Sequence, residues 1–168
     1  MSLITPFNFP VNMAAHKIAP AMAAGCPWIL KPSEKTPVTS IMLGEIIAES
    51  GWPADAWSIV PTTVENAERF VTDARIALVS FTGSVPVGWA IRAKASRKKV
   101  VLELGGDAAC IIDERADLDR VVARAMIGIY STSGQSCISV QRILAHRSLL
   151  PSLRSRLVEA TRALRVGD

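Results

Sequence analysis

Hydrophobic positions along the chain alternate between helical spacing and short continuous runs. Helical spacing predicts helices over residues 11–25, 36–51, 64–73, 84–96, 117–130 and 150–165. Short apolar runs predict strands at residues 28–31, 57–60, 76–81, 100–104, 109–113 and 142–147. The continuous run IALVSF at 76–81 is typical of a buried parallel strand, because helices cover both faces of such a sheet.

This alternation predicts an α/β fold with a parallel sheet and right-handed crossover connections. In such sheets, ligands bind beyond the carboxyl ends of the strands. Two predicted strands adjoin without an intervening helix at the sequence LGG (104–106), where two glycines interrupt the pattern. We therefore expect a domain boundary here, with residues 1–104 on one side and residues 105–168 on the other.

Composition narrows the range of partners. The chain has 168 residues, of which 49% are hydrophobic and 20% charged, as in a globular protein. No apolar run reaches the roughly 18 residues of a membrane helix, and the first residues lack the pattern of a secretory signal. The basic residues are scattered, and few aromatic residues accompany them. We expect neither a membrane nor a nucleic acid as a partner. The three cysteines form no C-x-x-C pair and are odd in number, which disfavours disulfides and a metal site and favours a reducing, cytoplasmic location.

Two loops that follow predicted strands have residues suited to a nucleotide. In FTGS (81–84), Gly83 permits a close backbone approach, and Ser84 lies at a helix N-terminus, where it either donates to a phosphate or caps the helix. In LKPSE (30–34), Lys31 and Glu34 are suited either to gripping the hydroxyls of a ribose or to forming a surface ion pair. Each motif taken alone fits both interpretations.

Three further residues have side chains suited to catalysis. Glu103 lies in the apolar strand VVLEL, where burial would suit a general base, although alternation equally favours a solvent-facing glutamate on an edge strand. Asn8 in TPFNFP has amide donors that suit a developing oxyanion, or it forms a turn. Cys137 lies among small polar residues in YSTSGQSCISVQR (130–142), whereas Cys26 and Cys110 are interpreted as structural.

Five motifs occur together in one order along the chain: PFNFP around Asn8, KPSE at 31–34, FTGS at 81–84, ELGG at 103–106 and GQSC at 134–137. In this order and approximate spacing they resemble the aldehyde dehydrogenase superfamily, from about residue 4 to the C-terminus. The resemblance implies a Rossmann-like portion of a cofactor domain over residues 1–104. It implies the start of an α/β catalytic domain over residues 105–168.

The resemblance also implies NAD(P)-dependent oxidation of a small aldehyde to a carboxylic acid. Cys137 resembles the nucleophile that forms a thiohemiacetal and then a thioester. Asn8 resembles the residue that donates, together with the Cys137 N–H, to the oxyanion. Glu103 resembles the base that activates the hydrolytic water. The implied cofactor-binding residues are Lys31, Ser33, Glu34, Thr82, Gly83, Ser84, Gly88 and Leu104. Glu34 would repel a 2′-phosphate, so NAD is the expected cofactor, with NADP as the alternative.

The chain departs from the family pattern in several places. Phe7 replaces a frequent tryptophan, PTTVENAERF (61–70) lacks the usual glycine-bearing loop, and Asp107 replaces a lysine or asparagine. The chain resembles only the central part of a family member, so we expect apolar faces to be exposed and the chain alone to have little activity. Because the family is usually homo-oligomeric, we also expect the chain to self-associate through these exposed faces. The alternatives are an acylating relative that transfers the acyl group to coenzyme A, which Glu103 disfavours, and a non-catalytic fragment or interaction module.

Overall fold

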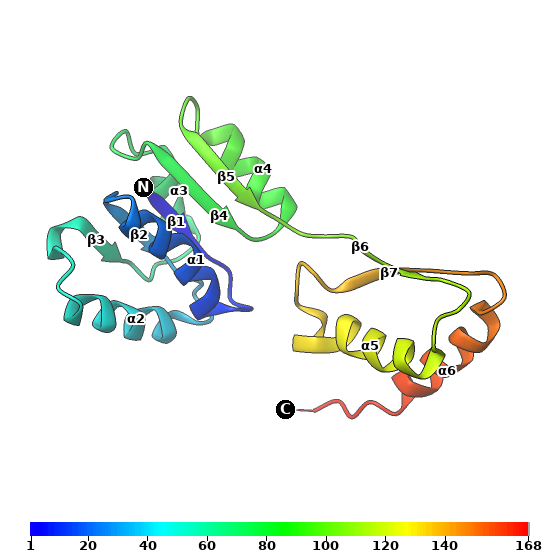
Figure 1. The fold of residues 1–168 in the computed structure, drawn as a ribbon. Coiled ribbons are helices and arrows are strands. Elements are labelled where there is room, and N and C mark those ends of the chain that lie inside the picture. The colour runs from blue at the N-terminus through cyan, green and yellow to red at the C-terminus, as the bar shows by residue number, and fades with distance from the viewer. Residues whose placement is uncertain (168) are drawn as a thin grey trace. The chain divides into compact units, whose positions relative to one another are not determined.

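The computed structural model describes residues 1–167, which form two compact units, one from Met1 to Leu104 and one that begins at Gly105 (Figure 1). The first unit contains a five-stranded sheet with the strand order β3-β2-β1-β4-β5. Every neighbouring pair in this sheet is parallel. The second unit contains a parallel pair of strands, β6 and β7.

Helices and strands alternate through the first unit. In chain order they are β1 (Ser2–Ile4), α1 (Pro10–Ala23), β2 (Trp28–Lys31), α2 (Pro37–Glu49), β3 (Trp57–Ile59), α3 (Glu68–Thr72), β4 (Leu78–Thr82), α4 (Val85–Lys94) and β5 (Lys99–Glu103). Pro10 and Pro37 begin α1 and α2, where a proline has no amide hydrogen to leave unpaired. Gly51 follows α2 at a φ of 78°, which is the left-handed conformation expected just beyond a helix end.

Two apolar clusters hold this sheet between its helices. Consecutive residues of a strand point to opposite faces, so Leu3 joins one cluster and Ile4 the other. The first cluster joins α1 and α2 to β1 and β2 through buried residues such as Leu30 and Ile47. The second lies on the other face, where α3 and α4 pack against β4. The strands are therefore buried on both faces near the sheet centre, as a parallel sheet requires.

The second unit consists of β6 (Ala108–Ile112), α5 (Leu118–Tyr130), β7 (Val140–Ala145) and α6 (Leu150–Arg162). The carboxylate of Asp117 caps α5 by accepting from the backbone N–H of Asp119 at 2.9 Å. Asp119 in turn forms an ion pair with Arg156, which joins α5 to α6. The β6–β7 register has an irregularity between Ala108 and Ala109.

The structure confirms the predicted α/β fold with a parallel sheet, and each predicted helix or strand has a counterpart with slightly different ends. The prediction for residues 64–73 as one helix is only partly right, because Glu65–Ala67 is a 3₁₀ turn that precedes the short α3. The hydrophobic pattern missed β1, although this strand lies at the centre of the sheet between β2 and β4. Three residues are too few to show a periodicity.

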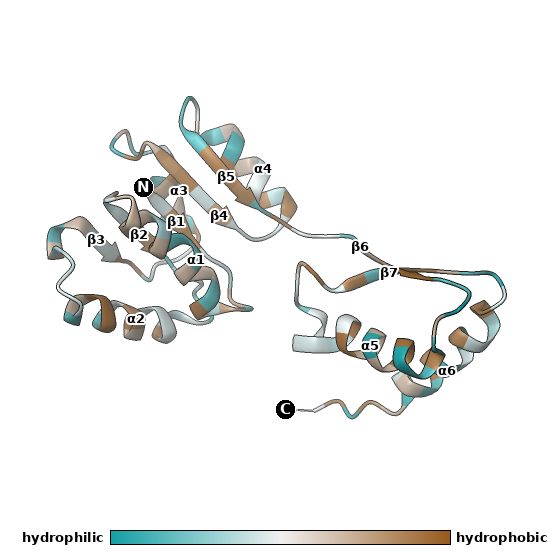
Figure 2. Cartoon of the chain, viewed as in Figure 1, coloured by the Kyte–Doolittle hydropathy of each residue, from teal (hydrophilic) through white to brown (hydrophobic). Residues whose placement is uncertain are grey.

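Large apolar side chains remain exposed in both units, as predicted from the sequence. Ile111 on β6 and Ile138 are 79% and 80% exposed, and Trp89 on α4 is 61% exposed. Figure 2 shows hydrophobic segments along β4 and β5. These faces are available for further packing.

Among residues 1–167, no helix is long and apolar enough to cross a membrane.

Candidate active site

The candidate residues of the first unit lie at the carboxyl ends of its strands, which we call the carboxyl edge of the sheet. The chain runs outward through β1, β2 and β3, then returns so that β4 lies on the other side of β1. This reversal is a topological switch point, where loops at the carboxyl ends of neighbouring strands diverge and leave room for a ligand. Asn8 follows β1, and the FTGS turn follows β4, so they flank the switch point.

Lys31 and Glu34 come together in the loop after β2. The Lys31 side chain is buried, and its Nζ lies 4.0 Å from Glu34 Oε1 and donates to the Pro32 carbonyl at 3.2 Å. Burial lowers the pKa of the Lys31 ammonium, and the Glu34 carboxylate opposes this shift. Ser33 orders the same loop by accepting from the Lys35 N–H at 3.2 Å. The loop therefore presents a charged pair at the carboxyl edge.

Side chains of Phe81 and Leu104 pack closely against the glycines of the FTGS turn and of α4. A Cβ on Gly83 would lie 2.5 Å from the Phe81 ring, and a Cβ on Gly88 would lie 2.4 Å from the Leu104 side chain. The Gly83 N–H donates to the Glu103 carbonyl at 3.0 Å, which joins this turn to the end of β5. Ser84 is the N-cap residue just before α4 and makes no side-chain capping bond, so its hydroxyl is not committed to the helix end.

Glu103 is the last residue of β5, which is the edge strand of the sheet. It pairs in register with Thr82, and alternation exposes its side chain. Of the two interpretations of this glutamate, the structure therefore supports the exposed edge-strand carboxylate. No strand lies beyond β5 in this sheet of residues 1–104, and the role of Glu103 as a base stays a prediction.

Lys17 is a charged residue near Glu103 that the motifs did not identify. It is buried on α1, where its ammonium donates to Ser80 Oγ of β4 at 2.8 Å. Burial lowers the pKa of Lys17 from 10.5 to about 8, while the Glu103 carboxylate opposes the shift. Ser80 and Thr82 lie on the same face of β4, so Lys17 and Glu103 share this face of the sheet. A detectable signal existed, because position 17 falls within the buried stripe Ala14, Ile18 and Ala21.

We expect the buried Lys17 to make stability pH-dependent. Because its pKa is lower in the folded chain than in the unfolded chain, the unfolded state binds more protons between about pH 8 and 10.5. The free energy of unfolding should therefore rise as pH increases from about 8, where Lys17 begins to lose its proton in the folded chain; below that pH, Lys17 adds no pH dependence. Urea unfolding from pH 7 to 9.5 should show this rise in the native chain, and Lys17→Met should diminish it. Lys35→Met, at an exposed position, should retain it; equal pH slopes in all three proteins would contradict the assignment to Lys17.

Asn8 lies in the loop after β1, which contacts the loop after β2 through Phe7 and Lys35. The Asn8 residue is half-buried. Its neighbour Phe7 has the Lys35 ammonium 4.7 Å from its ring centroid, which is within the range of a cation–π contact. The phenylalanine that replaces the frequent tryptophan thus retains an aromatic contact.

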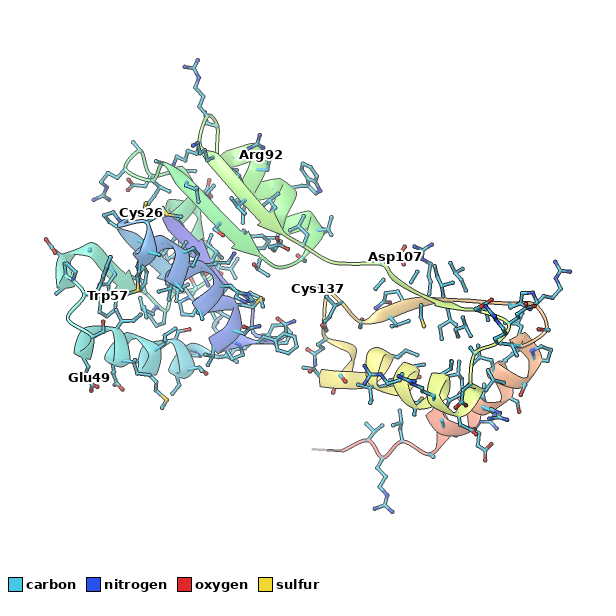
Figure 3. All side chains as sticks on the ribbon, in the orientation of Figure 1. Cys26, Glu49, Trp57, Arg92, Asp107 and Cys137 are labelled. Atoms are coloured by element: carbon cyan, nitrogen blue, oxygen red, sulfur yellow. The ribbon has the colours of Figure 1, made fainter. Side chains whose placement is uncertain are left out.

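Cys137 belongs to the second unit and lies on the loop that leads into β7 (Figure 3). The Ser139 N–H donates to the Ser136 carbonyl at 3.1 Å, so Cys137 is the second residue of a β-turn. Cys137 is exposed, whereas Cys26 and Cys110 are half-buried. Of the three thiols, the one in the GQSC motif is the most exposed.

The structure thus brings together three groups of predicted residues within the first unit: Lys31 with Glu34, Thr82 and Gly83 with Glu103, and Gly88 with Leu104. The predicted nucleophile Cys137 is in the other unit. No cluster of three or more metal-ligating side chains is found in the described part of the chain, residues 1–167.

Comparison with known proteins identifies the family. The sequence profile of the aldehyde dehydrogenase family matches residues 1–168. The chain is 38% identical to the 3-sulfolactaldehyde dehydrogenase of Priestia aryabhattai, covering 100% of this chain and 35% of that protein.

Solved structures agree with this assignment. Betaine aldehyde dehydrogenase from Staphylococcus aureus, in complex with NAD⁺, is 35% identical with a TM-score of 0.94, over 99% of this chain and 34% of its own. Glyceraldehyde-3-phosphate dehydrogenase from Methanocaldococcus jannaschii, complexed with NADP, is 37% identical with a TM-score of 0.92, over 99% of this chain and 38% of its own. The chain spans about a third of the length of these relatives. It belongs to the aldehyde dehydrogenase family.

Proposed function

We propose that this chain supplies the cofactor edge and the nucleophile of an enzyme that oxidises an aldehyde to a carboxylic acid with NAD or NADP. The observation that carries the proposal is the carboxyl edge of the first sheet, where Asn8, the Lys31–Glu34 pair and the FTGS turn surround the switch point. Ligands of parallel sheets bind at this place. Residues 1–104 are then part of the cofactor-binding domain, and residues 105–168 are the start of the catalytic domain.

The residues at this edge fit a dinucleotide. The N-terminus of α4, which follows Gly83 and Ser84, offers backbone N–H groups to an anion. Ser84 has a hydroxyl that does not cap the helix. Lys31 and Glu34 offer a donor and an acceptor to the ribose hydroxyls. We assign the pyrophosphate to Gly83 and Ser84, and the adenosine ribose to Lys31 and Glu34, with Ser33, Thr82, Gly88 and Leu104 in support.

In the proposed reaction, the Cys137 thiolate adds to the aldehyde carbon. The resulting oxyanion accepts hydrogen bonds from the Asn8 amide and the Cys137 N–H. A bound nicotinamide supplies the acceptor for the hydride that leaves this carbon. Glu103 then removes a proton from water, the water attacks the thioester carbonyl, and the sulfur leaves as the carboxylic acid forms.

Glu34 should favour NAD over NADP. A 2′-phosphate at the ribose would meet this carboxylate, which is 46% exposed and therefore partly screened by solvent. Replacing Glu34 with glutamine should raise the affinity for NADP relative to NAD by about fivefold, or roughly 1 kcal/mol. Calorimetric titration of both nucleotides into the 168-residue chain measures this ratio. Glu45→Gln, the same change at an exposed position on α2, should leave it unaltered; a ratio that is equal in all three proteins would exclude Glu34 as the determinant.

Reaction products test the proposed function. The chain is incubated with a short aldehyde and NAD, with and without coenzyme A, and the acid, acyl-coenzyme A and NADH are quantified. The proposal expects carboxylic acid in an amount equal to NADH, at low turnover. Acyl-coenzyme A as the main product would indicate the acylating chemistry instead. Absence of NADH in a chain that binds NAD would contradict the proposal for this chain.

We further propose that the enzyme works in a reducing compartment such as the cytoplasm, because its three cysteines are free. The exposed apolar faces around Trp89 and Ile111 are proposed to promote self-association of the chain.

A further inference from the structure

We propose that Gly106 is a positioning residue for Cys137: its missing side chain sets where the backbone of the nucleophile lies. The inference rests on the proposed function for the role of Cys137. The contact that carries it lies entirely within the second unit.

The backbones of the two residues approach each other too closely for any side chain at position 106. A Cβ on Gly106 would lie 2.0 Å from the Cys137 carbonyl oxygen, 3.2 Å from its carbonyl carbon and 4.0 Å from its Cα. The α-hydrogen of glycine takes that place and points at the oxygen, as in a weak C–H···O contact. Because the neighbour is a main-chain atom, no change of side-chain rotamer relieves the clash.

The topology of the second unit explains this approach. β6 and β7 are parallel, and Ala108 pairs with Val140, so the segments that lead into the two strands lie beside each other. Gly106 belongs to the segment before β6, and Cys137 to the segment before β7. Figure 3 labels Asp107 and Cys137 on these two segments.

An ion pair fixes the segment that contains Gly106. The carboxylate of Asp107 accepts a hydrogen bond from Arg142 Nε of β7 at 2.9 Å. The backbone carbonyl of Asp107 accepts a second one from Arg142 Nη2 at 3.4 Å. Asp107 replaces the lysine or asparagine of the family pattern, so this chain has an ion pair to β7 at that position. The ion pair holds the backbone next to Gly106 against the strand that Cys137 precedes.

The Cys137 loop itself needs an outside constraint. Thr132 and Ser133 have φ values of 54° and 55°, in the left-handed region that a β-branched or other non-glycine residue adopts at a cost. Such conformations persist when the surrounding structure determines them. Cys137 lies three residues after Gly134, and its backbone contact with Gly106 is one such constraint on the loop.

An alanine at position 106 must therefore displace the Cys137 carbonyl, or its own backbone, by about 1 Å, a shift that can lower the rate of a positioned reaction about 100-fold. The expected chemical consequence is a misplaced thiol beside an intact fold.

The test compares Gly106→Ala with Gly167→Ala in the full 168-residue chain. A Cβ on Gly167 would have no neighbour within 4 Å, so this variant is the matched control. Backbone amide and carbonyl NMR resonances report the position of residues 136–138. The rate of Cys137 alkylation by iodoacetamide, measured from pH 6 to 9, reports the thiol.

For Gly106→Ala, we expect shifted backbone resonances at residues 136–138 and an altered rate and pH profile of Cys137 alkylation. Gly167→Ala should match the native chain. Unchanged Cys137 resonances in folded Gly106→Ala would overturn the proposal, whatever the reactivity of the thiol. Slow alkylation in the native chain would count against the proposed function alone, because the resonance test does not depend on chemistry.

A second variant keeps the proposal testable if Gly106→Ala does not fold. Asp107→Asn weakens the exposed ion pair to Arg142 at little expected cost in stability, because pairs of this kind contribute at most about 1 kcal/mol. It should shift or broaden the Cys137 resonances. Asp113→Asn, which weakens another exposed ion pair, should not. Identical Cys137 resonances in both variants would overturn the role of this segment.

Discussion

Replacement of Cys137 by serine is expected to remove most of the rapid alkylation of the native chain. Cys137 is exposed on the loop before β7, whereas Cys26 and Cys110 are half-buried. The Cys26 thiol also donates weakly to the Ala24 carbonyl at 3.7 Å, and Cys110 lies within β6. Partial burial slows the reaction of a thiol, and an opening free energy of about 1.4 kcal/mol corresponds to a rate about tenfold lower.

Mass spectrometry after brief treatment with iodoacetamide measures this difference. Label should accumulate on Cys137 at least about tenfold faster than on the two half-buried thiols, in keeping with their need for local opening. Cys137→Ser should lose the fast phase, and Cys110→Ser should retain it. Fast labelling that persists in Cys137→Ser would show that another thiol is the reactive one.

Replacement of Leu30 by alanine is expected to lower the free energy of unfolding by about 3 kcal/mol. Leu30 is fully buried on β2, next to Lys31, in the cluster that joins α1 and α2 to the sheet. The change removes buried methyl groups and leaves a cavity, which the surrounding close packing fills only in part. The loss matters for function because β2 places the Lys31–Glu34 pair at the carboxyl edge.

Urea unfolding followed by tryptophan fluorescence measures this loss. Trp28 and Trp57 lie in the same region, with ring centroids 5.6 Å apart, so their emission reports the cluster. Ile41→Ala on α2 is the control, because that side chain is 45% exposed and should cost less than about 1 kcal/mol. Equal losses for the two variants would contradict the assignment of Leu30 to the core.

Sequence patterns predicted the regular elements well where those elements were long and bounded by turn residues. The helix ending before Gly51 and the strand at 28–31 follow directly from apolar spacing and a terminal glycine. β1 was missed, because the three residues Ser2–Ile4 show no periodicity and their burial comes from pairing with β2 and β4. A central parallel strand is recognised through its partners, which the local pattern does not contain.

The candidate residues were predictable where they occur in contiguous motifs. Lys31 with Glu34, and Gly83 with Ser84, each lie within a few positions of one another, so the sequence alone indicated them as candidates, and their roles stay predictions. Lys17 and Gly106 were missed, because their importance arises from contacts with Ser80 and Cys137, residues distant along the chain. The exposure of Glu103 was also undecided until the strand order placed β5 at the sheet edge.

The most direct test of the central claim is a search for an acyl group on Cys137. The Glu103→Gln chain is incubated with a short aldehyde and NAD, and its mass and peptide map are measured within one turnover. Because water activation is impaired while the thiol remains, the account predicts one acyl group on Cys137, released by hydroxylamine and absent when NAD or the aldehyde is omitted. A chain that binds NAD but forms no such adduct, or an equal adduct in a Cys137→Ser background, would contradict the claim that Cys137 is the nucleophile.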